Sequence, residues 1–187
     1  MSARTLVVAL TIWLIAAIAM VQAGVLTRVP PLAITVGLVA LQLVVASAVP
    51  AVARWVREVD IRVFLLPHVL RLVGFVLLQK VGEGAMPPEF VSIGWGDIVS
   101  AAGAIALLAA GPDLLSGNRR FFLWAWNVVG SADMLMLLVK AAPIALREPE
   151  KLAIFTSLPF GLLPLFVVPM IMASHVLIFR RIYSKPA

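Results

Sequence analysis

Residues 5–26 read TLVVALTIWLIAAIAMVQAGVL and contain no charged side chain. A helix of about 20 apolar residues is long enough to cross the hydrocarbon core of a bilayer. Comparable apolar stretches recur along the chain, so the sequence predicts an all-α, polytopic integral membrane bundle. The six transmembrane helices are expected at residues 5–27, 31–53, 63–81, 97–111, 121–142 and 155–180, within a single transmembrane domain that covers residues 1–187.

The overall composition agrees with a chain that has lipid on its outside. Hydrophobic residues make up 63% and charged residues 13%, whereas soluble domains have about half and about a quarter. The chain has no cysteine, which excludes disulfides, iron–sulfur clusters and cysteine-based zinc sites. No phosphate-binding glycine loop, histidine zinc motif or nucleophilic serine elbow is present. Enzymatic and non-enzymatic functions both stay open.

The distribution of basic residues predicts the orientation. When the loops are assigned to alternate sides, nine Lys and Arg residues fall on one side and five on the other. The richer side is expected in the cytoplasm, which places both termini there. The nine are Arg4, Arg54, Arg57, Arg62, Arg119, Arg120, Arg180, Arg181 and Lys185.

The net charge of +6 sits in short clusters between apolar runs, so no nucleic-acid partner is expected. The expected partner is the lipid bilayer. We predict a multi-pass protein of a cell membrane, with a bacterial inner membrane favoured and with a homo-oligomer or a larger membrane complex allowed.

A few costly polar side chains lie within the apolar runs, and each is a candidate for a functional site. At about 1.5 Å per residue, they lie roughly 7 to 20 Å from the nearest cytoplasmic arginine. Four predicted helices contribute to these depths, so one pocket in the cytoplasmic half is expected. The candidate ligand-binding residues are Gln42, His68, Arg71, Asn127, Asp133 and His175.

Charge and spacing predict how some of these residues pair. His68 and Arg71 are one turn apart and share a helix face. Asp133 is the only acid placed well inside a predicted helix, so an Arg71–Asp133 ion pair is expected, either as a structural link or as part of a site. Asp97 is interpreted as the N-cap of the short fourth helix.

Four functions are compatible with these residues. The leading hypothesis is a site for a small apolar or amphipathic ligand or a cofactor, with b-type haem held by His68 and His175 as the most concrete candidate. The main alternative is a non-catalytic subunit or assembly factor. A small proton-coupled transporter, in which Arg71 and Asp133 change partners, is a third hypothesis. An intramembrane enzyme acting on a lipid, with a histidine as general base and Arg71 binding an anionic group, is the fourth.

Overall fold

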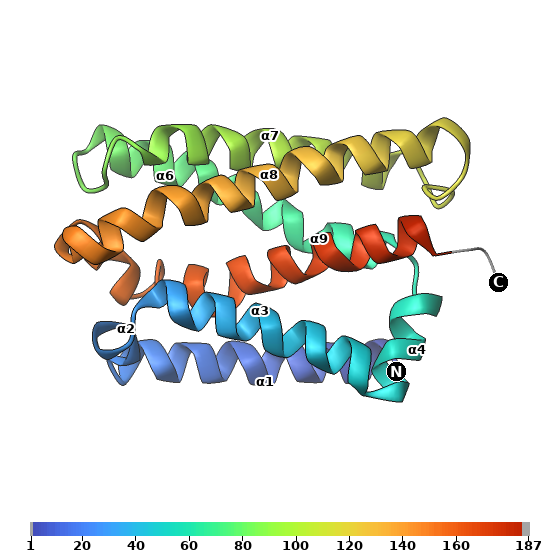
Figure 1. The fold of residues 1–187 in the computed structure, drawn as a ribbon, viewed down its shortest axis with the longest axis horizontal. Coiled ribbons are helices and arrows are strands. Elements are labelled where there is room, and N and C mark those ends of the chain that lie inside the picture. Colours follow the sequence, from blue (N-terminus) through green and yellow to red (C-terminus); the bar gives the residue numbers. More distant parts are fainter. Residues whose placement is uncertain (1, 185–187) are drawn as a thin grey trace. The chain divides into compact units, whose positions relative to one another are not determined.

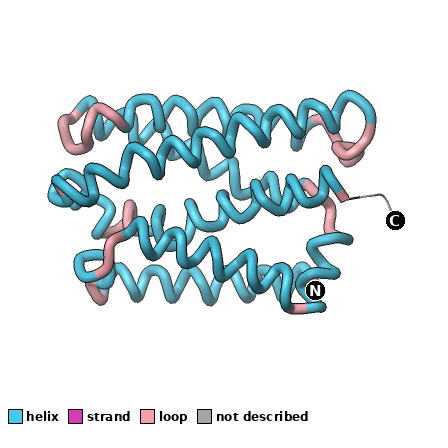
Figure 2. Tube along the Cα trace, in the orientation of Figure 1, coloured by secondary structure: helices cyan, strands magenta, loops and turns pink. Residues whose placement is uncertain are grey.

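The computed structural model describes residues 2–184 and is all-helical, with 84% of the residues in helices and no strand among those described. Figure 2 shows the helices joined by short loops. Lys185, one of the nine basic residues that predict the orientation, lies outside the described residues. Six helices are long and apolar enough to cross a membrane, which confirms the predicted number. They are Arg4–Gln22, Pro31–Ala48, Arg62–Gly82, Phe90–Ala109, Gly117–Arg147 and Leu163–Tyr183.

Proline positions explain several differences from the predicted boundaries. The second predicted helix divides into α3 (Pro31–Ala48) and α4 (Pro50–Glu58), with an extended Val49 between them. A residue that precedes proline disfavours the helical conformation, so the break falls where expected. The last predicted helix, expected from residue 155, begins later, with η3 (Leu163–Val167), and continues as α9 (Val168–Tyr183). A separate 3₁₀ helix, η2 (Pro149–Thr156), precedes it.

The helices pack into two compact units. One consists of the chain up to Glu58 together with Ala142–Met170, and the other consists of Val59–Ala141 together with the chain from Ile171 onward. The long helix α8 (Gly117–Arg147) and helix α9 each contribute to both units. Whether the chain forms the single domain that the sequence predicts stays a prediction.

The first unit contains α1 (Ala3–Gln22), α2 (Val25–Arg28) and α3, which pack with η3. Its buried core includes Leu165 of η3. Pro169 has no N–H group to donate to the Leu165 carbonyl four residues earlier. The indole of Trp13 donates to that carbonyl at 3.0 Å, and the Thr35 hydroxyl donates to the Pro164 carbonyl at 2.9 Å. Side chains of α1 and α3 thus bind the backbone of the proline-interrupted helix.

The second unit is built on one helical segment with three parts, α5 (Arg62–Leu65), η1 (Leu66–Val73) and α6 (Gly74–Gly82). Helix α7 (Phe90–Ala109) packs along η1 and α6 (Figure 1). At the crossing point, a Cβ atom on Gly74 would lie only 2.4 Å from the carbonyl oxygen of Gly94. Two glycines therefore let these backbones touch, which is typical of close helix packing in lipid.

Candidate functional site

Two further glycines of α7 receive large side chains of α8. A Cβ atom on Gly96 would lie 1.7 Å from Oδ1 of Asp133, and one on Gly103 would lie 2.5 Å from Cδ1 of Trp126. The two glycines are seven residues apart on α7, and Trp126 and Asp133 are seven residues apart on α8, which is about two turns of helix. The absence of a side chain at these two positions therefore lets a carboxylate and an indole of α8 pack closely against α7.

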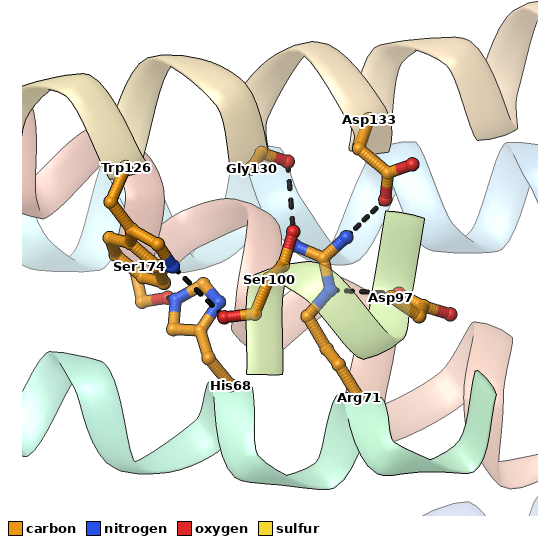
Figure 3. Close-up of polar contacts among 8 residues, drawn as sticks. All are labelled: His68, Arg71, Asp97, Ser100, Trp126, Gly130, Asp133 and Ser174. Atoms are coloured by element: carbon orange, nitrogen blue, oxygen red, sulfur yellow. Dashed lines mark hydrogen bonds and ion pairs between the residues drawn. The ribbon is translucent and has the colours of Figure 1, made fainter. Parts of the chain in front are cut away.

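Arg71 of η1 is the central ionic group. Its side chain is 1% exposed, and Nε donates to Asp97 Oδ1 at 2.7 Å. Nη2 donates to Asp133 Oδ2, and Nη1 donates to the Gly130 carbonyl at 3.4 Å. Figure 3 shows the guanidinium held between the two carboxylates. The predicted Arg71–Asp133 ion pair is present, and a second carboxylate shares the cation. We call Arg71, Asp97 and Asp133 the ion triad.

The interpretation of Asp97 as an N-cap is wrong. Helix α7 begins at Phe90, so Asp97 lies two turns inside it and is 6% exposed. Glycines at 94 and 96 look like loop residues in a soluble protein, but glycine is frequent inside membrane helices. A buried arginine with two carboxylates within reach is the signal that could have identified Asp97, because a buried cation needs partners.

The protonation of His68 follows from its hydrogen bonds. Its Nε2 lies 2.8 Å from the hydroxyl oxygen of Ser174, and that hydroxyl donates its single hydrogen to the Ile171 carbonyl at 2.7 Å. Ser174 can then only accept from the ring. A second proton would place an unpaired charge on a ring that is 0% exposed. His68 therefore carries a single proton, on Nε2, and Nδ1 presents a lone pair.

The other histidine is fixed by an amide. Asn127 Nδ2 donates to the His175 carbonyl at 3.1 Å, which settles the orientation of the amide and leaves Oδ1 as an acceptor. His175 Nδ1 lies 2.7 Å from that oxygen and must donate to it. His175 therefore carries its proton on Nδ1, and Nε2 presents a lone pair.

The two rings form what we call the imidazole pair. They are 0% and 2% exposed, and their centroids are 4.4 Å apart at an interplanar angle of 62°. Trp126 packs against both rings, at 4.7 Å from His68 and 5.5 Å from His175. Among the described residues, neither His68 Nδ1 nor His175 Nε2 has a hydrogen-bond partner, and nor has the hydroxyl of Ser100.

Most of the predicted site residues lie together in the second unit. Five of the six candidates, His68, Arg71, Asn127, Asp133 and His175, lie in the second unit and contribute to the ion triad or the imidazole pair. Gln42 lies on α3 in the first unit, where its Nε2 donates to the Leu38 carbonyl of its own helix at 3.2 Å. Sequence reasoning missed Asp97, Ser100 and Ser174. Ser100 and Ser174 carry no signal in the sequence, because serine is common in membrane helices.

The residues do not fit a haem. Two axial histidines must hold the porphyrin plane between them, but the rings of His68 and His175 are in contact edge to face. The Nε2 of His68 already donates to Ser174. Within residues 2–184, no group of three or more His, Cys, Asp or Glu side chains is placed to hold a metal ion.

The chain belongs to the family described as Domain of unknown function (DUF8737), whose model matches residues 29–183. The matched region contains all the residues of the ion triad and the imidazole pair. No curated protein and no solved structure matches the chain.

Proposed function

We propose that this member of the DUF8737 family is a six-span integral membrane protein that binds a small ligand at the imidazole pair, with both termini in the cytoplasm. The six apolar helices and the bias of nine basic residues against five support this topology. Large apolar side chains such as Ile12, Phe121 and Val139 are more than half exposed, as expected where lipid is the solvent. From the multi-pass topology and this bias of basic residues, we infer that the protein lies in a bacterial inner membrane.

One observation carries the ligand-binding proposal. Two buried imidazoles in contact each present an unprotonated nitrogen that no described residue satisfies. A buried acceptor without a donor costs about 1–3 kcal/mol, so the folded protein gains stability from a molecule that donates to both. A purely structural cluster would have these atoms paired.

The chemistry of the pair indicates the class of ligand. Both free nitrogens accept hydrogen bonds and donate none. A cation is disfavoured, because Nη1 of Arg71 packs beside the same glycine, Gly130, that His175 Nε2 contacts. A buried site also disfavours an unpaired charge on the ligand. We therefore infer a neutral ligand with hydroxyl or N–H donors, carried on a small apolar or amphipathic body that packs against Trp126.

The ion triad favours a second candidate, a non-catalytic subunit or assembly factor. All three guanidinium nitrogens of Arg71 are engaged by α7 and α8, so the arginine links three helical segments. This commitment weighs against a carrier in which Arg71 exchanges Asp133 for another partner. It also weighs against a lipid enzyme that needs Arg71 free for an anionic group. Under the second candidate, only ordered water donates to the free nitrogens of the imidazole pair.

The test uses the fact that the chain has only two histidines. Protein labelled with ¹⁵N-histidine has four ring nitrogens, and we expect two protonated and two unprotonated signals, the protonated ones being His68 Nε2 and His175 Nδ1. Small molecules extracted from the purified protein are then compared by mass spectrometry between wild type and His68→Phe, which removes one free acceptor.

The matched control is Thr35→Val, which removes one buried hydrogen bond in the first unit. We expect a hydroxyl- or N–H-bearing molecule to be retained by wild type and Thr35→Val and lost from His68→Phe. Identical extracts from all three proteins would leave the subunit function as the better account. Doubly protonated rings would contradict the two free acceptor nitrogens on which the ligand proposal depends.

A further inference from the structure

A groove of about 360 Å³ opens in the first unit, away from the residues discussed so far. Its walls come from α2, the start of α3, the end of α8 and η2. A volume near this value is at the lower end for sites that hold small molecules. The residues that line the groove include Leu26, Arg28, Val29, Leu152, Ala153 and Thr156.

The wall that carries Arg28 is rigidly placed. Gly24 has a φ of +69°, a conformation that glycine adopts without strain. The Thr27 hydroxyl donates to the Gly24 carbonyl at 2.7 Å, and Leu26 is 3% exposed in the core of the unit. The short helix α2 is therefore anchored by its neighbours, and Arg28 is its last residue.

The opposite wall is one face of η2. Pro149, Leu152, Ala153 and Thr156 all line the groove. In this 3₁₀ helix they form two adjacent rows, Pro149 with Leu152 and Ala153 with Thr156. The charged residues of this wall, Glu148, Glu150 and Lys151, do not line the groove, and Glu148 forms an ion pair with Lys151. This wall offers an apolar surface with a single hydroxyl.

Arg28 is the one charged residue among the described residues that line the groove. It makes no ion pair or side-chain hydrogen bond within the described part of the chain. An arginine beside an apolar surface is complementary to a molecule with an anionic head and an apolar body, and guanidinium groups bind phosphate by paired hydrogen bonds.

The position of the groove along the chain selects one such molecule. Arg28 lies between the end of α1 at Gln22 and the start of α3 at Pro31, both of which are ends of membrane-length helices. Helix ends of this kind lie at the depth of lipid headgroups. We propose that the groove binds an anionic phospholipid, with its phosphate on Arg28 and an acyl chain along Leu26 and Leu152.

This inference rests on the proposed membrane insertion but not on the imidazole pair. The full-length protein, purified in an uncharged detergent, is titrated with phosphatidylglycerol and followed by native mass spectrometry. Arg28→Gln should weaken binding about fivefold, the effect of one arginine near an anionic lipid surface. Arg147→Gln is the matched control, because Arg147 lies at the end of α8 next to the groove without lining it. Binding to the control should equal binding to wild type.

A second variant tests the apolar part. Ala153 is exposed on the groove wall, so Ala153→Phe should occupy the groove without disturbing the core, and it should abolish the specific binding. Equal binding of phosphatidylcholine, full competition by inorganic phosphate, or wild-type binding by Arg28→Gln would each overturn the proposal. The ¹⁵N signals of the imidazole pair should stay unchanged in both variants, so a failure here is distinguishable from a failure of the proposed function.

Discussion

Replacement of Arg71 by methionine is the most direct test of the ion triad. Methionine keeps an unbranched apolar stem but lacks the guanidinium, so most of the packing of the stem is kept while the cation is removed. Asp97, at 2.7 Å from Nε, and Asp133 then lose their shared partner, and the Gly130 carbonyl loses a donor. The buried Asp97 and the partly buried Asp133 are left without the positive charge that they share.

The expected magnitude follows from this geometry. Removal of one partner of a buried ion pair costs about 3–5 kcal/mol, because the remaining charge stays buried and unpaired. The 1% exposure of Arg71 gives water no access to replace it. We expect Arg71→Met to lower the free energy of unfolding by about 4 kcal/mol. The triple variant Arg71→Met, Asp97→Asn, Asp133→Asn removes all three charges and should recover at least about half of that loss.

Unfolding can be followed in mixed micelles of a mild detergent and dodecyl sulfate. Tryptophan fluorescence is a suitable signal, since the chain has five tryptophans and Trp126 contacts the imidazole pair. Wild type, the single variant and the triple variant are compared under identical lipid and detergent conditions. The reasoning is refuted if the single variant unfolds within about 1 kcal/mol of wild type, a loss typical of exposed ion pairs, or if the triple variant is no more stable than the single one.

Three smaller changes test the packing around the site. Gly96→Ala places a methyl group where Oδ1 of Asp133 lies, and it should lower the free energy of unfolding by about 1–3 kcal/mol. Its control is Gly37→Ala, whose methyl group meets nothing within 4 Å and should leave the stability equal or raise it. Gly130→Ala brings Cβ to 2.6 Å from the His175 ring; we expect shifted ¹⁵N signals for that ring, and unchanged signals would contradict the close contact. Asn127→Leu removes the acceptor that holds the proton of His175 on Nδ1, so NMR should detect a mixture of tautomers in place of one.

Hydropathy was enough to predict the six apolar helices, because an uncharged run of about 20 residues matches the thickness of the bilayer core and is longer than a buried helix of a soluble domain needs. The helix boundaries were less accurate where proline and glycine occur. Val49 precedes a proline and ends α3 early, as local rules allow. The early start of α7 at Phe90 could not be predicted in the same way, since its glycines are accommodated by packing against α6 and α8, which is a tertiary effect.

The candidate site was predicted in part for a related reason. Depth along a helix can be counted from the sequence, and it grouped His68, Arg71 and Asp133 correctly within one unit. The direction in which a side chain points cannot be counted in this way. Gln42 has a comparable depth but bonds to its own helix, and the participation of Asp97 depends on where α7 begins. The tautomers depend on single hydrogen bonds from Ser174 and Asn127, which only the folded structure defines.

The ion triad and the imidazole pair are connected through the geometry of η1. This segment is a 3₁₀ helix, in which residues three apart lie directly above one another. His68 therefore lies one turn before Arg71 on the same face. On α8, Gly130 lies between Trp126, which packs against the imidazole pair, and Asp133, which belongs to the ion triad. We therefore expect the ion triad to help hold the two rings in contact. Loss of Arg71 should disturb both stability and the histidine signals, whereas a change confined to the His68 ring leaves every contact of the guanidinium in place.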